Sequence, residues 1–222
     1  MQKSNVKWLL MALFLTGAFV VAGLCGLDKT LYQLIHRLDC NMWTISGSFL
    51  CSLAIILGKI FSVKSWLIVS GGAVLCFFIY KALTNERDFR FAFVKIKNSY
   101  VFYVFLSVLT ATIVTGVLKV LIGRSRPVLF DALGQTFFEP GVFEHTFNSM
   151  PSGHAAASFA GFVMLGLLFP RVKWLMWGGA VLVGISRIYV GAHWPSDIVF
   201  GAFIGCISAI FVKYLLRRIN SK

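Results

Sequence analysis

Apolar runs long enough to cross a lipid bilayer recur along the whole chain. A spanning helix needs about 20 predominantly apolar residues, and six segments have this character: Trp8–Leu27, Trp66–Leu83, Tyr100–Ile122, Ser152–Phe169, Trp174–Tyr189 and Ile198–Leu216. Of the 222 residues, 58% are hydrophobic and only 13% are charged, which is too little charge to cover a water-facing surface. The sequence therefore predicts an all-α integral membrane protein, and it excludes a soluble domain and a disordered chain.

A seventh apolar segment, Met42–Phe61, is interrupted by Ser, Gly and Lys residues and decides the topology. If it lies in the membrane interface instead of crossing, thirteen of the 21 Lys and Arg residues fall on one side, including those between Lys81 and Lys97. Lys and Arg are enriched in cytoplasmic loops, so this side is predicted to be the cytoplasm. We expect a six-transmembrane helix bundle with both termini cytoplasmic and with Met42–Phe61 as an additional amphipathic helix on the outer face. Residues 1–222 are expected to form a single membrane domain.

The net charge of +13, from 21 Lys and Arg against 8 Asp and Glu, would suggest a polyanionic partner in a soluble protein. Here the cations flank the apolar runs, as in a chain that is oriented across a bilayer. The predicted partner is therefore the lipid bilayer, and no nucleic acid is expected. The five cysteines form no CxxC pair. Cys40 and Cys51 could pair, but a separation of eleven residues proves nothing, and no structural disulfide is expected.

Cations cluster at the outer end of the third predicted span, in the sequence Lys119-Val-Leu-Ile-Gly-Arg-Ser-Arg126-Pro127. Lys119 and Arg126 are seven residues apart, so in a continuous helix they lie on one face at a distance of roughly 10 Å. Two cations in this arrangement could bind one anion. The alternative is that Lys119 extends its ammonium toward water and that Arg124 and Arg126 are ordinary flanking charges.

The sequence Pro151-Ser152-Gly153-His154 opens the fourth predicted span. The start of a helix offers unpaired N–H groups and the positive end of the helix dipole. Gly153 allows close approach of the backbone, and Ser152 adds a hydrogen-bond donor. These residues predict an anion-binding site with the titratable His154 beside it. The alternative is that Ser152 is only an N-cap and His154 an interfacial residue.

A third polar group, Ser186-Arg187-Ile-Tyr-Val-Gly-Ala-His193-Trp-Pro-Ser-Asp197, connects the fifth and sixth predicted spans. Pro195 suits the first turn of a helix, so Asp197 can reach back to an imidazole nitrogen of His193. A carboxylate so placed fixes the tautomer of the imidazole and supports its positive form, as a nucleophilic or basic His requires. A lone His-x-x-x-Asp pair is usually structural. Arg187 strengthens the functional interpretation, because an Arg so near the membrane needs an anionic partner.

In this order, KxxxxxxRP, PSGH and SRxxxxxHxxxD resemble the three-part signature of the type 2 phosphatidic acid phosphatase superfamily. The superfamily includes lipid phosphatases, bacterial acid phosphatases and vanadium haloperoxidases. Every signature position is matched, by Lys119, Arg126, Pro127, Pro151, Ser152, Gly153, His154, Ser186, Arg187, His193 and Asp197. The resemblance covers roughly residues 100–216.

The resemblance implies a phosphatase that uses neither a metal ion nor another cofactor. The phosphate oxygens would be held by Lys119, Arg126, Ser152, Gly153 and Arg187. His193, oriented by Asp197, would attack phosphorus and form a phosphohistidine. His154 would then protonate the leaving group and afterwards take a proton from the hydrolytic water.

A bundle with short outer loops favours a membrane-borne substrate, because little else is available to bind one. We therefore expect a lipid phosphatase of the cell inner membrane whose site opens to the periplasmic face. Candidate substrates are lipid A 1-phosphate, undecaprenyl pyrophosphate, phosphatidylglycerophosphate and phosphatidic acid, and no residue chooses among them. Two alternatives stay open: a lipid phosphotransferase that uses the same site, and a non-catalytic membrane protein with a relic phosphate site.

A few further residues are assigned by default. His36 and His145 fit no motif and are expected at the surface. Trp194 and the Phe-rich stretch Phe137–Phe147 are candidates for a lipid-facing rim, although aromatic residues are common at membrane interfaces without any substrate role. Glu144 and His145 lie close to His154 in the sequence, but three flanking cations disfavour a zinc site, so no metal is predicted.

Overall fold

The computed structural model describes residues 3–36, 40, 48–84 and 99–220, and within these ranges the secondary structure is helical with no strand. The helices are α1 (Lys3–Ala22), α2 (Asp28–Ile35), α3 (Phe49–Ile60), α4 (Val63–Leu83), α6 (Tyr100–Ile122), α7 (Pro127–Leu133), α8 (Gly153–Leu168), α9 (Lys173–Tyr189) and α10 (Pro195–Asn220). A π-helical turn, Gly23–Leu27, joins α1 to α2. The predicted all-α class is confirmed.

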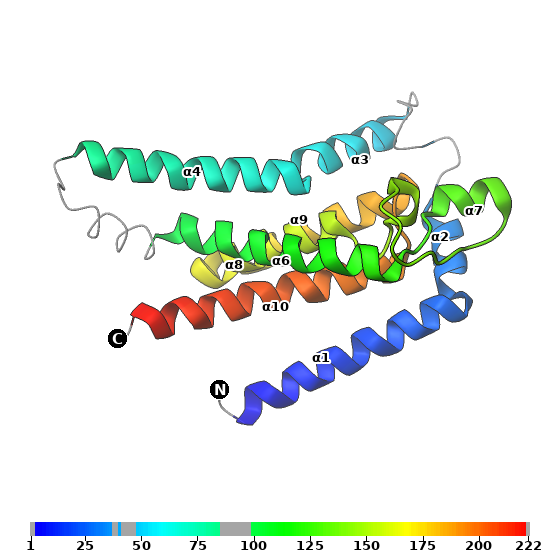
Figure 1. Cartoon of the computed structure of the whole chain (residues 1–222), viewed down its shortest axis with the longest axis horizontal. Helices are drawn as coiled ribbons and strands as arrows, with labels where there is room; N and C mark the ends of the chain where they lie inside the picture. The colour runs from blue at the N-terminus through cyan, green and yellow to red at the C-terminus, as the bar shows by residue number, and fades with distance from the viewer. Residues whose placement is uncertain (1–2, 37–39, 41–47, 85–98, 221–222) are drawn as a thin grey trace.

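The long helices lie alongside one another, and the connections that matter for function gather at one end of the bundle. Figure 1 shows α2, α7 and the loop before α8 at this end, which we call the loop end, and both chain termini at the opposite end. Among the described residues, the apolar stretches Lys7–Ile35, Val63–Lys81, Tyr100–Ile122 and Pro195–Ile219 are long enough to cross a membrane. The chain is therefore a multi-pass membrane protein, while the six-span count stays a prediction.

Helix α3 covers the described part of the segment that was expected to form an amphipathic outer helix. It has only 12 residues, too few to span a bilayer alone, and Figure 1 shows it continuing nearly in the direction of α4. Its buried side packs against α9 through small residues such as Ala54 and Gly58. The exposed side carries Phe49, Leu50 and Ile56, so the amphipathic character is weak in these residues. The position of α3 at the outer surface stays a prediction.

Cys40 and Cys51 form a disulfide, which corrects the expectation that the chain has none. The two Cα atoms are 5.5 Å apart, within the range that a disulfide requires. Both residues are fully buried in a small cluster with Val190 and Ala192, so the disulfide at the start of α3 packs against the segment that follows α9. Sequence spacing alone could not reveal this pairing.

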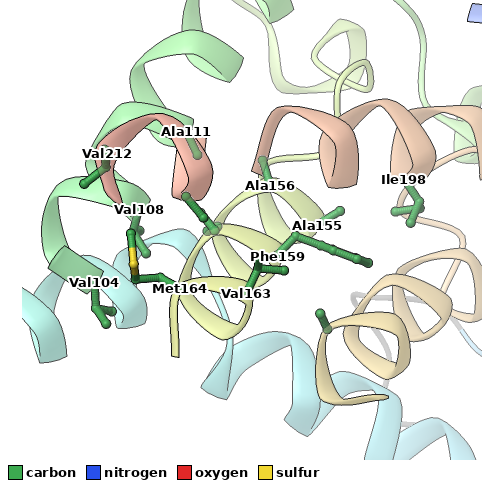
Figure 2. Close-up of a cluster of buried hydrophobic side chains, with 14 of the residues drawn as sticks. Val104, Val108, Ala111, Ala155, Ala156, Phe159, Val163, Met164, Ile198 and Val212 are labelled. Atoms are coloured by element: carbon green, nitrogen blue, oxygen red, sulfur yellow. The ribbon is translucent and has the colours of Figure 1, made fainter. Parts of the chain in front are cut away.

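Helix α8 is the centre of the core, and its small residues set the distance to its neighbours. Figure 2 shows side chains of α8, including Ala156 and Met164, packed between those of α6 and α10. Gly201 and Gly205 of α10 lie so close to α8 that an added Cβ would come within 2.5 Å of the carbonyl oxygens of Ser152 and Ala156. Small residues of this kind allow close helix packing in membranes. The start of α8 and the start of α10 are therefore held together at the loop end.

Candidate active site

Lys119 and Arg126 meet at one backbone oxygen, although the helix between them does not continue. Helix α6 ends at Ile122, and Gly123 turns the chain in the left-handed conformation with φ 59°. A Cβ at Gly123 would lie 2.0 Å from the carbonyl oxygen of Glu139, so only glycine fits this turn. Lys119 Nζ and Arg126 Nη2 both donate to the carbonyl oxygen of Asn148. The two cations converge as predicted, by a turn and a returning loop instead of a continuous helix.

The Arg126 guanidinium is held entirely by backbone oxygens. Its Nε donates to His145 O at 2.9 Å and its Nη1 donates to Ala192 O at 2.8 Å. Burial lowers the pKa of Arg126 to about 10, and the charge of Asp197 opposes this effect. The side chain is therefore a cation in a fixed position, and its hydrogen-bond partners do not neutralise its charge.

Arg187 lies near the end of α9 and is also buried. Its Nε donates to Ser186 Oγ at 3.1 Å, and its Nη2 donates to the carbonyl oxygen of Ala54 in α3. Gly58, one turn further along α3, lies directly against the guanidinium, since a Cβ there would overlap it. Helix α3 thus covers one side of the site, a contribution that the sequence did not predict. No carboxylate of the described residues lies within 4.0 Å of Lys119, Arg126 or Arg187 in an ion pair, and we call these three residues the cation cluster.

The start of α8 lies beside the cation cluster. Ser152 is the N-cap, and its hydroxyl accepts a hydrogen bond from Ala155 N at 3.4 Å, so the capping role is present. The Ser152 N–H donates to Asp197 O at 3.0 Å, which links α8 to α10. At Gly153 an added Cβ would lie 3.8 Å from Lys119 Cε and 3.3 Å from a methyl group of Val63. The start of α8 therefore lies close to Lys119, while the predicted anion-binding role of Gly153 stays a prediction.

His193 and His154 face the same region, with ring centroids 6.5 Å apart. His193 Nδ1 lies 3.7 Å from Asp197 Oδ2, beyond hydrogen-bond distance, and this nitrogen has no hydrogen-bond partner among the described residues. Burial holds the pKa of His193 well below 6.5, and the charges of Arg126 and Lys119 lower it further. The imidazole is therefore neutral at physiological pH, which is the nucleophilic form.

The carboxylate of Asp197 accepts its hydrogen bonds from groups other than His193. Its Oδ2 accepts hydrogen bonds from Ser149 Oγ at 2.5 Å and from Trp194 N at 2.9 Å. Its Oδ1 accepts one from Arg124 Nη1 at 2.8 Å. Asp197 therefore lies near His193 without a hydrogen bond to it, and the orientation of His193 by Asp197 stays a prediction.

Sequence reasoning assigned no such network, and it considered Arg124 only as a possible flanking charge. Arg124 is 2% exposed and forms ion pairs of 2.8 Å with both Asp28 and Asp197. We call Asp28, Arg124, Ser149, Ser196 and Asp197 the carboxylate cluster. One signal was available in the sequence: Asp28 directly follows an apolar span, where an unpaired carboxylate is costly.

Two aromatic assignments from the sequence are wrong. Trp194 does not face lipid, because it is fully buried and its Nε1 donates to Ser125 O at 3.0 Å. His36 is not a surface residue, since its side chain is 7% exposed and stacks on Tyr32 with ring centroids 4.7 Å apart. His145 is exposed, as expected.

The arrangement suits chemistry on a phosphate group. The cation cluster and the α8 start offer positive charge and donors, which stabilise the charge of a phosphoryl group in transfer. A neutral His lies beside them, with a second His that can move protons. No three His, Cys, Asp or Glu side chains of the described part of the chain converge as metal ligands.

Comparison with known families agrees with this chemistry. The model of the PAP2 superfamily matches residues 100–221, which is more than half of the chain. The chain therefore belongs to the PAP2 superfamily. The matched region contains all three motifs and all of the predicted site residues.

Individual relatives carry names of lipid phosphatases. The chain is 35% identical to the lipid A 1-phosphatase of Rhizobium johnstonii over 162 residues, which are 68% of this chain and 63% of that protein. It is 35% identical to the undecaprenyl-diphosphatase of Sulfolobus acidocaldarius over 120 residues, 52% of this chain and 53% of that protein. These alignments span less than two thirds of either relative. The fold resembles the crystal structure of the transmembrane PAP2 type phosphatidylglycerolphosphate phosphatase from Bacillus subtilis, with a TM-score of 0.57, 21% identity and 96% of each chain covered.

Proposed function

We propose that the protein is a metal-independent membrane lipid phosphatase that hydrolyses a phosphomonoester or pyrophosphate on a lipid through a phosphohistidine. The observation that carries the proposal is the convergence of Lys119, Arg126 and Arg187, without carboxylate partners among the described residues, beside a buried neutral His193. The proposal includes no metal ion, because these three cations supply the positive charge that phosphoryl transfer requires.

The position of Asp197 supports a different role for each nitrogen of His193. Nδ1 faces Asp197, so Nε2 on the opposite side of the ring is the attacking atom. A bond forms from Nε2 to phosphorus while the bond from phosphorus to the lipid oxygen breaks, and His154 supplies the proton to the leaving oxygen. Water then attacks the phosphohistidine, His154 takes a proton from this water, and inorganic phosphate leaves. Ser152 and Gly153 contribute donors to the phosphate oxygens at the start of α8.

We further propose six spans with both termini in the cytoplasm and the site at the periplasmic face of the inner membrane. Both termini lie opposite the loop end in Figure 1, as an even number of crossings requires. The Cys40–Cys51 disulfide packs against Val190 and Ala192 beside the site, and disulfides persist in oxidising compartments such as the periplasm. Alkaline phosphatase fused to the C-terminus should be inactive, and green fluorescent protein fused there should fluoresce. The reverse result would exclude this topology.

Several membrane lipids fit the proposed site. The relatives include a lipid A 1-phosphatase, an undecaprenyl-diphosphatase and a phosphatidylglycerolphosphate phosphatase, and phosphatidic acid is a further lipid with a phosphomonoester. The loop end carries only α2, α7 and connecting loops among the described residues, which favours the bilayer as the source of substrate.

The proposal is tested by incubating the purified protein in detergent with each of these four lipids and measuring released inorganic phosphate. We expect release from at least one of them, and none from the matched variant His193→Gln, which keeps most of the side-chain volume. No release from any lipid between pH 5 and pH 9 would refute the proposal. With labelled substrate and an added acceptor lipid, transfer of the label only into lipid would identify a phosphotransferase instead.

A further inference from the structure

The carboxylate cluster contains an excess of negative charge in a place where water is excluded. Arg124 donates from Nη2 to Asp28 Oδ2 and from Nη1 to Asp197 Oδ1, both at 2.8 Å. Asp28, Arg124 and Asp197 are each at most 2% exposed. Two carboxylates share one guanidinium, so these three side chains carry a net charge of −1. Buried charges of this kind are costly unless the geometry fixes them.

The backbone of the first span is shaped to deliver the Asp28 carboxylate. The π-helical turn between α1 and α2 contains Gly26 with φ 125°, a conformation that favours glycine. Three residues earlier, a Cβ at Gly23 would lie 2.8 Å from Asp28 Oδ2 and 2.9 Å from Ser196 Cβ. Gly23 therefore leaves the space in which Asp28 reaches the start of α10.

At the start of α10, Asp28 binds the residue next to Asp197. The Ser196 N–H donates to Asp28 Oδ1 at 2.8 Å, and Ser196 Oγ donates to Asp28 Oδ2 at 2.5 Å. A carboxylate that accepts from the first N–H groups of a helix acts as a cap and stabilises the positive end of its dipole. Asp28 thus caps α10 from a distant part of the sequence.

The same cap fixes the carboxylate that faces the reacting imidazole. Asp197 follows Ser196, is held by Arg124 on one oxygen, and presents the other oxygen 3.7 Å from His193 Nδ1. An imidazole that forms a bond to phosphorus through Nε2 becomes positively charged. A net negative cluster on its Nδ1 side stabilises this charge, provided that Asp197 stays in place.

We infer that Asp28 is a positioning residue for the reaction, acting through Arg124 and Ser196 on Asp197 and so on His193. The inference rests on the proposed function. It adds a residue at the end of the first apolar helix to those that control turnover. Asp28 does not contact the cation cluster in any hydrogen bond or ion pair of the described residues, so it acts on the chemical step and not on phosphate binding.

The test compares Asp28→Asn with the matched control Asp131→Asn. Asp131 also fastens α2, by accepting a hydrogen bond of 2.6 Å from Tyr32 Oη, but it does not touch Arg124 or Ser196 in any described contact. The probe is dioctanoyl phosphatidic acid in detergent micelles, with inorganic phosphate as competitive inhibitor. For Asp28→Asn we expect kcat to fall about 10- to 100-fold, which is a loss of about 1.4 to 2.7 kcal/mol. KM and the Ki of inorganic phosphate should stay within about twofold of wild type, because the cation cluster is unchanged.

The kinetic outcomes separate positioning from a general loss of structure. A folded Asp28→Asn protein with kcat within twofold of wild type would overturn the inference. So would an equal loss of kcat in Asp131→Asn, or an equal rise in KM and Ki, since either result would reflect damage to the fold or to phosphate binding.

A melting experiment tests the arrangement without turnover. Arg124→Met leaves two buried carboxylates facing each other, and adding Asp28→Asn removes one of these charges. The double variant should therefore melt at a higher temperature than Arg124→Met alone, and a double variant that melts no higher would overturn the pairing. If the wild type hydrolyses no lipid, the proposed function and the catalytic role of Asp28 both fail. The melting comparison of the single and double variants still tests whether Asp28 and Arg124 form a buried ion pair.

Discussion

Arg124 and Arg126 are two residues apart and almost equally buried, but their surroundings are opposite. Arg124 is neutralised by two carboxylates of the carboxylate cluster. Arg126 donates hydrogen bonds only to backbone oxygens and belongs to the cation cluster with Lys119 and Arg187. The turn at Gly123 and the loop that follows it direct the two guanidinium groups to different partners.

The two arginines differ because one stabilises the fold and the other is available to bind an anion. A buried cation with paired carboxylates is already satisfied and holds elements together. Three cations that donate to carbonyl and hydroxyl oxygens and to no carboxylate of the described residues keep their positive charge for an anion. A phosphate dianion matches that charge. His193 lies between the two clusters, so substitutions on each side should have different consequences.

The largest effect is expected at His193 itself. His193→Ala should lower kcat/KM by about 10⁴-fold or more, because no other residue can form the proposed phosphohistidine. Phosphate release from the lipid that the wild type hydrolyses is the measurement. Asp197→Asn should lose less, since the nucleophile remains.

The side chain of His193 is 2% exposed, so the alanine variant leaves a cavity. His193→Gln, which keeps most of the side-chain volume, therefore serves as the second variant and should show the wild-type melting profile within a few degrees. Full turnover in either variant would remove the mechanism.

Arg124→Met should cause the largest loss of stability. Breaking a buried ion pair by removing one partner costs about 3–5 kcal/mol, because the remaining charge stays buried. Unfolding followed by Trp fluorescence in detergent would show this as a lower melting temperature. Arg126→Met should destabilise clearly less, because it relieves repulsion within the cation cluster. Equal losses in the two variants would contradict the distinction between the clusters.

Arg126→Gln should have the opposite profile, with activity lost and the fold kept. Removing one group that stabilises transition-state charge costs about 10²- to 10³-fold in rate. The Ki of inorganic phosphate should rise as well, because the same guanidinium binds the product. Arg126→Lys should restore only part of the activity, since an ammonium cannot make the three hydrogen bonds to His145, Ala192 and Asn148. An Arg126→Gln enzyme with wild-type kinetics would show that the cation cluster does not bind phosphate.

The sequence predicted the all-α membrane class and the convergence of its three motifs because both depend on residue type and order. Apolar runs define spans, and cations beside spans demand anionic partners. The structure places Lys119, Arg126, Ser152, Arg187 and His193 close together at the loop end of the bundle. Their roles in catalysis remain proposals.

What the sequence could not predict depends on distant contacts. Asp28 and Arg124 are separated by 96 residues, and the sequence around each residue does not indicate that the other is its partner. The disulfide was missed for another reason: Cys40 and Cys51 are only eleven residues apart, and their spacing does not show whether two cysteines pair. Trp194 was assigned to lipid from its residue type, but the Ser125 carbonyl and the buried ring of Tyr32 give it a place in the core.

The pH dependence of stability gives the smallest expected effect and the finest test of the comparison. His193 borders both clusters, and its pKa reports which of their charges dominates. The carboxylate cluster alone would raise this pKa above 6.5, whereas burial and the cations Arg126 and Lys119 lower it well below that value. The unfolded chain then binds a proton as the pH falls below about 6.5, while folded His193 does not.

Stability from His193 should therefore be fully present above pH 6.5 and decrease on acidification, by up to about 1.4 kcal/mol per pH unit. Melting temperatures at pH 7.5 and pH 5.5 would measure this, with the wild type losing more than His193→Gln. In the control His145→Gln, the loss of melting temperature on acidification should stay close to that of the wild type. His145 is exposed and therefore contributes less to the pH dependence of stability. If the wild type instead gained stability relative to His193→Gln at pH 5.5, His193 would carry a proton in the fold, and the carboxylate cluster would outweigh the cation cluster at the reacting nitrogen.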